Sequence, residues 1–449
     1  MQSKRTMKLS AVALALALAT TACGGRSDDN ASTDGGSSGT SGASGTTPSG
    51  DEAFSISTDD CDNYEASTGV TDTEILLGSS NPQSGLYAAY AELAKGYNAF
   101  LAYKNASGGV NDHQVTVKAL DDGYVDPAKS KSNVETLVND DQVFGIFNVV
   151  GTPNNLEIRG QLGTECVPNL FAATGAQQMG EPATYPWTIG SIPTYATESA
   201  TFVTWLEDNK PDAKIGIVRQ NDDFGEGYSL PLAKAIEGTD LTIVDEQTYN
   251  PGEADVSSQV TALKNAGADT VLVAASGLAC PNALTSIKSQ ADWNPTTYAS
   301  ATCASKTLIG VSGPAAEGVL SAIYLKEPAN PEWADDAGMQ EYLTEGAKYG
   351  LSQDDLTNGA VVTGWNTGQM LTDTLGMAPE LTRQAVMQQA YNLPGIELPM
   401  LLPGITMTTD GTADPYPIES MRMGQWNGTF FDWVGELTSF EGKTADYVG

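Results

Sequence analysis

A single histidine, His113, limits the catalytic chemistry open to this chain of 449 residues. It lies in a Gly-Gly-Val-Asn-Asp-His turn before a strand, where we expect it to face solvent. A Ser-His-Asp triad, a Cys-His pair or a histidine zinc site would have to use this one residue. The paired carboxylates Asp121-Asp122 and Asp222-Asp223 leave a carboxylate-dependent hydrolase open, although such pairs also suit turns and helix caps. The sequence therefore predicts no catalytic centre, no metal site and no cofactor.

The cysteines indicate disulfide chemistry instead of metal or redox chemistry. There are five, and no pair has C-x-x-C spacing. If Cys23 is set aside, the even number left in an exported chain suggests two disulfides, with three possible pairings. Cys61 and Cys166 each precede a strand expected in one sheet, whereas Cys280 and Cys303 each follow a strand of the next region. We therefore favour Cys61–Cys166 and Cys280–Cys303.

The N-terminus has the pattern of an export signal. Residues 1–8 include Lys4, Arg5 and Lys8, and residues 9–19 are apolar except for one serine. This order of regions, which ends in small residues, predicts a signal peptide over residues 1–22. Its apolar part is too short to span a bilayer. Thr-Ala-Cys at its end resembles the lipobox of bacterial lipoproteins, with Thr20 in place of the usual leucine, so we expect Cys23 to be lipidated. The Gly/Ser/Thr-rich stretch over 23–60 predicts a flexible linker.

Charge and length restrict the partners of the remaining chain. The net charge is −34, from 56 acidic and 22 basic residues. Binding to nucleic acid or to anionic lipid needs clustered Lys and Arg, so we expect neither, and membrane attachment through the lipid alone. No later segment is apolar and long enough to cross a membrane. The length after the linker suits one large or two medium domains.

Strand and helix patterns alternate along this body. Expected strands are 75–79, 115–120, 143–149, 169–172, 214–219, 241–248 and 270–274. Expected helices are 87–104, one from 127, one after 153, 195–209, one after 227 and 256–266. Two successive βαβ series predict an α/β protein with two Rossmann-like lobes, each with a parallel sheet. Ligands of such sheets bind beyond the C-terminal strand ends, which places a site in the cleft between the lobes.

Eight short motifs occur in register through this body. They are Gly78-Ser-Ser-Asn-Pro-Gln-Ser-Gly85, Asn105-Ala-Ser-Gly-Gly-Val-Asn111, Asp121-Asp-Gly-Tyr-Val-Asp-Pro127, Gly151-Thr152, Ala172-Ala173-Thr174, Asp223-Phe-Gly-Glu-Gly-Tyr228, Tyr249-Asn-Pro-Gly-Glu-Ala-Asp255 and Ala315-Ala-Glu-Gly-Val319. Together they resemble the leucine/isoleucine/valine-binding family of type I periplasmic binding proteins, the solute receptors of ABC importers. The resemblance extends from about residue 70 to the C-terminus.

The resemblance implies an arrangement of lobes and a set of binding residues. The chain of that family crosses between lobes three times, which gives lobe 1 residues 70–190 plus 320–405 and lobe 2 residues 191–319 plus 406–449. The implied ligand-binding residues are Tyr87, Thr152, Ala172, Ala173, Thr174 and Phe224. Strand topology adds Ser276, with Gly277 beside it. Trp365 is expected either near a crossover or in the core, and Asn427-Gly428 predicts a hairpin turn between two late strands.

One departure from the family bears on the ligand. Amino-acid binders of this family place a carboxylate after the strand that corresponds to Thr297–Cys303, and this segment has no Asp or Glu. Thr302 of this segment is a further candidate ligand-binding residue, whose hydroxyl can accept a hydrogen bond from an ammonium but leaves its charge unbalanced. We therefore expect an amide, a urea-like compound or an organic acid in preference to a free aliphatic amino acid, unless Asp222 or Asp223 supplies the counter-ion.

The predicted function is that of a monomeric extracytoplasmic lipoprotein that binds a small molecule and delivers it to an ABC permease. A ligand-sensing module that signals to a membrane partner is the alternative, and a secreted carboxylate-dependent hydrolase is a third.

Overall fold

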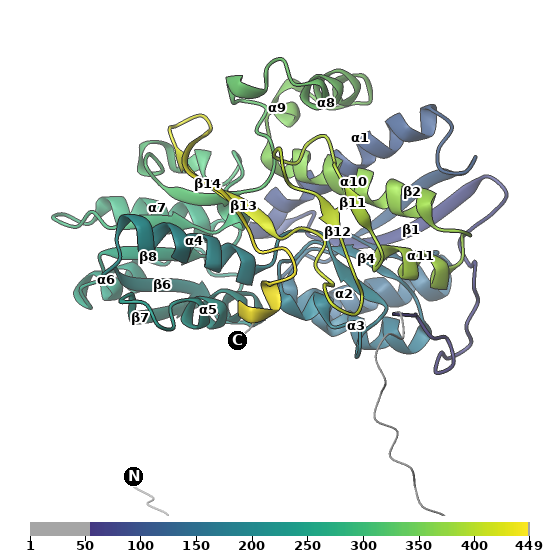
Figure 1. Cartoon of the computed structure of the whole chain (residues 1–449), viewed down its shortest axis with the longest axis horizontal. Coiled ribbons are helices and arrows are strands. Elements are labelled where there is room, and N and C mark those ends of the chain that lie inside the picture. The colour runs from purple at the N-terminus through teal and green to yellow at the C-terminus, as the bar shows by residue number, and fades with distance from the viewer. Residues whose placement is uncertain (1–53, 448–449) are drawn as a thin grey trace, which may run out of the picture. The chain divides into compact units, whose positions relative to one another are not determined.

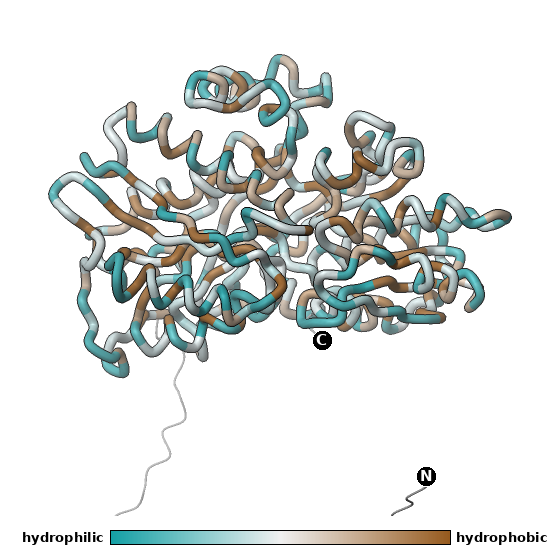
Figure 2. Tube along the Cα trace, turned by 180° about the vertical axis from the view of Figure 1, so that it is seen from behind, coloured by the Kyte–Doolittle hydropathy of each residue, from teal (hydrophilic) through white to brown (hydrophobic). Residues whose placement is uncertain are grey.

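A computed structural model of the chain describes residues 54–447. The expected signal peptide, Cys23 and most of the expected linker therefore lie outside the described residues. The described part contains one five-stranded and one seven-stranded sheet, and helices cover each of them (Figure 1). We call the five-stranded sheet with its helices lobe 1 and the seven-stranded sheet with its helices lobe 2. Hydrophobic residues follow the inner strands of both sheets, and hydrophilic residues follow the outer turns (Figure 2). None of the helices in this part has the length and hydropathy that a membrane span requires.

Lobe 1 has an all-parallel sheet of order β2-β1-β3-β4-β5. Its strands are β1 (Glu74–Asn81), β2 (Gln114–Asp121), β3 (Ile146–Phe147), β4 (Asn169–Ala172) and β5 (Thr188–Gly190). Its helices are α1 (Glu92–Ala106), α2 (Pro127–Glu135), α3 (Thr152–Glu165), α8 (Ala337–Lys348), α9 (Gln353–Leu356), α10 (Gly359–Met377) and α11 (Arg383–Ala390). In Figure 1, α1 and α10 lie on one side of this sheet, and α2 and α3 lie on the other.

Two glycines let α1 and α10 cross with their backbones in contact. A Cβ at Gly96 would come within 2.9 Å of the Cα of Gly364, and a Cβ at Gly364 would meet the Leu93 carbonyl. Any side chain at either position would therefore push the helices apart. Because α10 comes after residues 214–323, which supply five strands of the seven-stranded sheet, this crossing holds a later segment of the chain against lobe 1.

Lobe 2 has a mixed sheet of order β14-β13-β10-β9-β8-β6-β7, in which β13 is antiparallel to both of its neighbours. Its strands are β6 (Lys214–Gln220), β7 (Thr242–Tyr249), β8 (Thr270–Ala274), β9 (Thr296–Ala299), β10 (Leu320–Ile323), β13 (Ser420–Trp426) and β14 (Phe431–Ser439). Its helices are α4 (Tyr195–Asn209), α5 (Asp223–Ala235), α6 (Ser257–Asn265) and α7 (Ala279–Ser289). Trp426 pairs with Phe431 across the turn that contains Asn427-Gly428, as the sequence predicts.

The central strand of lobe 2 shows why both of its faces are covered. All five residues of β8 are buried. Val271 and Val273 belong to a cluster with side chains of α6 and α7, whereas Leu272 and Ala274 belong to one with side chains of α4 and α5. Alternate residues of a strand face opposite sides of the sheet, so a continuous apolar run requires a layer on each side.

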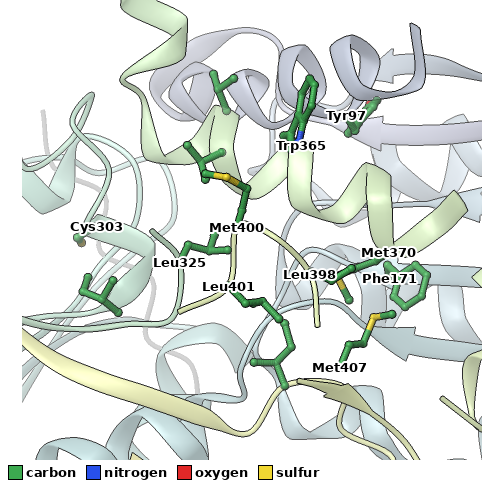
Figure 3. Packing of buried hydrophobic residues seen from close by; sticks show 14 of the residues in the cluster. Tyr97, Phe171, Cys303, Leu325, Trp365, Met370, Leu398, Met400, Leu401 and Met407 are labelled. Atoms are coloured by element: carbon green, nitrogen blue, oxygen red, sulfur yellow. The ribbon is translucent and has the colours of Figure 1, made fainter. Parts of the chain in front are cut away.

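The chain passes between the lobes at three places: after β5, after β10 and after β12. β12 (Met407–Thr408) pairs with β11 (Pro394–Ile396) in a separate two-stranded sheet. Leu325 lies in the second crossover, and Leu401 lies in the segment before the third crossover. An antiparallel bridge pairs these two residues. Figure 3 shows these two leucines and Met400 among the packed side chains of this region.

One predicted lobe boundary needs correction. The boundary before residue 320 would place β10 in lobe 1, but β10 pairs with β9 and β13 in the sheet of lobe 2. Tyr298 on β9 ties the strands together, because its hydroxyl accepts a hydrogen bond from the Ala322 amide at 3.2 Å. The change of lobe therefore follows Ile323. The other predicted boundaries stay a prediction.

The two disulfides are the pairs that the sequence favours. Cys61 is bonded to Cys166, with Cα atoms 5.5 Å apart, and Cys280 is bonded to Cys303, with Cα atoms 5.6 Å apart. The first joins the segment before β1 to the end of α3, and the second joins α7 to the turn after β9. Each disulfide therefore closes a loop within one lobe.

Three elements differ from their sequence-based predictions. The expected strand 143–149 is reduced to β3, which ends before Asn148 because that residue, with a φ of 53°, leaves the extended conformation. The expected helix from Tyr87 begins as the 3₁₀ segment η1 (Gly85–Ala91) before α1. α5 begins at Asp223, ahead of the predicted start after Gly227, because the side chain of Asp222 accepts from the Gly225 amide as an N-cap.

Candidate functional site

A cavity lies between the lobes and along the second crossover. It has about 1400 Å³ of empty space, part of which is open to solvent. Lobe 1 contributes Gly151 and Ala173 after β3 and β4, and lobe 2 contributes Phe224, Ser276 and Thr302. Aromatic side chains make up much of the wall: Tyr90, Tyr124, Tyr195, Phe224, Tyr228, Tyr324 and Trp426. The cavity therefore lies at the strand ends, where the topology predicts a ligand site.

The lobe 1 side of the cavity is the N-terminus of α3. Gly151 is its N-cap, with a φ of 106°, and no side chain caps the first turn. A Cβ at Gly151 would come within 2.8 Å of the Tyr124 ring, so only glycine fits there. Directly behind it, the hydroxyls of Thr152 and Thr174 lie 2.7 Å apart. Uncapped amides at a helix N-terminus favour an anionic group of a ligand.

The lobe 2 side contains a buried carboxylate, Glu198 on α4, with 2% of its surface exposed. The hydroxyl of Tyr228 donates to Oε2 at 2.8 Å, and the hydroxyl of Tyr298 and the amide of Ala301 each donate to Oε1 at 2.8 Å. Burial raises the pKa of Glu198 to about 7, although these three donors favour the charged form. A carboxylate has about four acceptor positions, so Oε2 can accept one further donor from the cavity.

Within the part of the chain that the structure describes, no cation balances this carboxylate. Among residues 54–447, no lysine or arginine forms an ion pair with Glu198. A buried carboxylate without a cation is costly, and a cationic group of a ligand at Oε2 would remove that cost. The cavity therefore offers a place for a positive charge at Glu198 and a place for a negative charge at α3.

Two tyrosines of η1 join the lobes beside the cavity. The hydroxyl of Tyr87 accepts from the Gly252 amide at 3.0 Å and donates to Gln220 Oε1 at 3.2 Å. The hydroxyl of Tyr90 accepts from the Gly277 amide at 3.1 Å and donates to the Thr302 carbonyl at 3.3 Å. These bonds require the lobes to be closed, because their donors and acceptors lie on opposite lobes.

The structure gathers the predicted binding residues in three positions. Ala173, Phe224, Ser276 and Thr302 line the cavity. Ala172, Thr152 and Thr174 lie directly behind its lobe 1 wall and are buried. Tyr87 is a contact between the lobes and does not line the cavity.

Trp365, Asp222 and Asp223, which the sequence also singles out, do not line the cavity. Trp365 packs in the core against Phe100, Tyr103 and Tyr342. Asp222 is the N-cap of α5 and also accepts from Gln220 Nε2 at 2.6 Å. Neither Asp222 nor Asp223 lines the cavity, whereas Glu198 does.

The paired carboxylates considered for hydrolysis hold turns and caps. Asp121 accepts hydrogen bonds from the Gln83 amide and the Ser84 hydroxyl. Asp122 is buried and accepts from the Ser80 and Ser130 hydroxyls and from the Tyr124 amide. These side chains fix the loop that carries Tyr124.

Sequence reasoning missed Glu198, although a signal was present. Tyr195, Glu198 and Phe202 recur at helical spacing on the buried face of α4, and a carboxylate on such a face needs a partner. The same spacing also indicates Tyr195 as part of the wall. Tyr124 and Tyr228 lie within motifs already noted, but their side chains are brought to the cavity only by the folded loops.

The protein has two lobes with a cleft at their strand ends. One lobe offers a place for an anion and the other a place for a cation. This arrangement is that of a receptor for a small solute. A family model described as periplasmic binding protein matches residues 74–430, and the chain belongs to this family. Its members are extracytoplasmic substrate-binding proteins of ABC transporters that bind amino acids or other small ligands. The fold is accordingly that of type I periplasmic binding proteins.

Individual relatives are similar to this chain at moderate identity. Leu/Ile/Val-binding protein homolog 2 of Brucella abortus is 28% identical over 319 residues, which cover 66% of this chain and 81% of the relative. The fold resembles a branched-chain amino acid ABC transporter protein of Thermus thermophilus with bound valine, at 19% identity and a TM-score of 0.74, over 85% of this chain and all of that one. It also resembles a fatty acid ABC transporter substrate-binding protein of Thermomonospora curvata, at 21% identity and a TM-score of 0.71, over 86% and 97%.

Proposed function

We propose that this protein is a lipid-anchored receptor that binds an amino-bearing solute, with the ligand ammonium at Glu198, and delivers it to an ABC permease. The signal pattern over 1–22 and the Thr-Ala-Cys ending at Cys23 support export and lipidation. The linker composition over 23–60 supports a tether that lets the receptor act as a monomer away from the membrane.

The buried carboxylate of Glu198 carries this proposal. It lines the cavity, has no ion-pair partner in the described chain, and keeps one acceptor position free. An ammonium donates up to three hydrogen bonds and supplies the missing positive charge. The expectation against amino acids rested on the lack of an acidic residue in Thr297–Cys303, and Glu198 removes that premise because its Oε1 accepts from the Ala301 amide within this segment.

The opposite side of the cavity supports a ligand carboxylate. The first-turn amides of α3 can donate to an anionic oxygen, and the hydroxyls of Thr152 and Thr174 lie directly behind them. We propose that Ala173, Phe224, Ser276 and Thr302 contact the remainder of the ligand. A zwitterionic amino acid satisfies both charged positions, and branched-chain amino acids named for the Brucella relative are the first compounds to test.

The experiment compares ligands that differ only in the ammonium. Calorimetry with leucine, isoleucine and valine is paired with the corresponding 2-hydroxy acids, in which a hydroxyl replaces the amine. We expect an amino acid to bind at least about tenfold more tightly than its hydroxy analogue, because a hydrogen bond to a charged group contributes about 1.5–3 kcal/mol.

Two variants identify the carboxylate responsible. Glu198→Gln should lower affinity for the amino acid at least about tenfold and remove its advantage over the hydroxy acid. Glu207→Gln is the matched control, because Glu207 is an exposed residue of the same helix. Equal affinities for each amino acid and its hydroxy analogue in the wild-type protein would refute the ammonium position.

A further inference from the structure

The cavity continues from Glu198 along the second crossover. Tyr298 links the two regions, because its hydroxyl donates to Glu198 and accepts from the Ala322 amide, and the chain then leaves β10 as the crossover. The walls beyond this point are mostly apolar or aromatic: Ile323, Tyr324, Leu325, Ala360, Val362 and Trp426. An elongated ligand with an apolar middle therefore fits this part of the cavity better than a compact one.

A second carboxylate, Glu327, lines this extension. The amide of Phe431 donates to its Oε2 at 2.8 Å, and no hydrogen bond to its Oε1 is formed within the described chain. Burial, with a smaller contribution from the charge of Asp432, raises the pKa of Glu327 to about 7. Like Glu198, it forms no ion pair with a lysine or arginine of residues 54–447.

The two lysines along the cavity have other partners. The ammonium of Lys326 donates to Asp336 Oδ2 at 2.7 Å and to the Pro399 carbonyl at 2.8 Å. The ammonium of Lys306 is exposed and donates to the Thr357 hydroxyl at 2.9 Å. Neither lysine balances Glu327, so the wall of the cavity has two uncompensated carboxylates separated by apolar surface.

We propose that Glu327 is a second cation subsite, so that the ligand has a terminal amino group in addition to the amino group at Glu198. The ligand class is then that of diamino acids, in which an aliphatic chain joins the two amines. Tyr324 and Trp426 line the same extension and offer aromatic surface beside the second cation. This inference rests on the proposed function, because Glu198 and the N-terminus of α3 hold the other end of the ligand.

The test uses pairs of amino acids that differ by one terminal amine. Ornithine is compared with norvaline, lysine with norleucine, and the two next longer diamino acids with their monoamino counterparts, all by calorimetry at pH 8. We expect the diamino acid to bind about tenfold or more tightly than its counterpart at one chain length. The preferred length should then report the separation of the two carboxylates.

Three variants assign this preference to Glu327. Glu327→Gln should reduce the preference for the diamino acid to about twofold or less. Glu327→Asp keeps the charge but withdraws it by one methylene, so the preferred ligand should become one carbon longer; this variant also tests the subsite if the glutamine variant does not fold. Glu332→Gln is the matched control, because Glu332 is exposed on the following segment and should leave the preference unchanged.

The outcomes separate this inference from the proposed function. If monoamino and diamino acids bind equally and both depend on Glu198, the second subsite is wrong and the proposed function stands. If no amino acid of either series binds, and the branched-chain set also fails, the proposed function is wrong and the second subsite fails with it. A preference for diamino acids that persists in Glu327→Gln would also overturn the assignment.

Discussion

Replacing Glu198 by glutamine should make the ligand-free protein more stable at alkaline pH relative to the wild type. In the native protein burial raises the pKa of Glu198 to about 7 from an ordinary value of 4.5. Between these two pH values, the native state keeps a proton that the unfolded chain has lost. The contribution of Glu198 to the free energy of unfolding therefore falls as pH rises through this range and is constant above about pH 7.

The expected size follows from the same two values. A raised pKa of this extent corresponds to about 3 kcal/mol, and with 2% exposure solvent screens it little. Glutamine remains neutral throughout. Its carbonyl oxygen can accept from Tyr298 and from the Ala301 amide, and its amide nitrogen can donate to the Tyr228 hydroxyl. Between pH 4.5 and pH 8, the unfolding free energy of the variant should therefore rise by about 3 kcal/mol relative to that of the wild type.

Urea unfolding of both ligand-free proteins at several pH values from 4.5 to 8.5 measures this shift. Burial also raises the pKa values of Glu327, to about 7, and of Glu419, to about 8, but both residues are present in the two proteins and cancel in the comparison. A difference that stays constant with pH would refute the reasoning. A shift toward the wild type would show that the protein itself provides a cation for Glu198.

Three further results are expected. Tyr87→Phe removes the hydrogen bonds to Gly252 and Gln220, so ligand affinity measured by calorimetry should fall about fivefold or more. Tyr97→Phe, which affects a hydrogen bond within lobe 1, should leave the affinity unchanged. Equal effects of the two variants would refute a role of Tyr87 in closure. Removing Cys61–Cys166 by paired serine substitution should cost about 5 kcal/mol of unfolding free energy and removing Cys280–Cys303 about 3, because the loops span 105 and 23 residues; the reverse order in denaturant titrations would contradict this. Cys23→Ser should abolish lipidation, and a mature protein that keeps the lipid mass would disprove that assignment.

Most of the fold could be predicted from the sequence because the spacing of apolar residues in each helix and strand agrees with the residues that the structure buries. The helix Tyr195–Asn209 and the strand Thr270–Ala274 have the predicted bounds, since amphipathic and fully apolar periods are strong local signals. The extent of lobe 2 was less predictable. β10 has only four residues, and its place beside β9 depends on pairing between distant segments.

The lining of the cavity was predictable in part. Ala173, Phe224, Ser276 and Thr302 reach the cavity because strand ends and helix starts are set by topology. Tyr87 was assigned to the ligand, but a sequence cannot show that its hydroxyl is used by the opposite lobe. Such contacts depend on how far the lobes close, which no local pattern encodes.

Glu198 lies close to the segment in which a carboxylate was expected without belonging to that segment. It lies 103 residues before Ala301, yet its Oε1 accepts from that amide. A search for a carboxylate along Thr297–Cys303 therefore fails, although one lies in hydrogen-bonding contact with that segment. Because α4 begins directly after the first crossover, a ligand that binds Glu198 as proposed would lie next to a hinge. In the proposed binding mode a ligand cation compensates this carboxylate, while the hydrogen bonds of Tyr87 and Tyr90 form only between closed lobes, so we expect ligand binding and closure to favour each other.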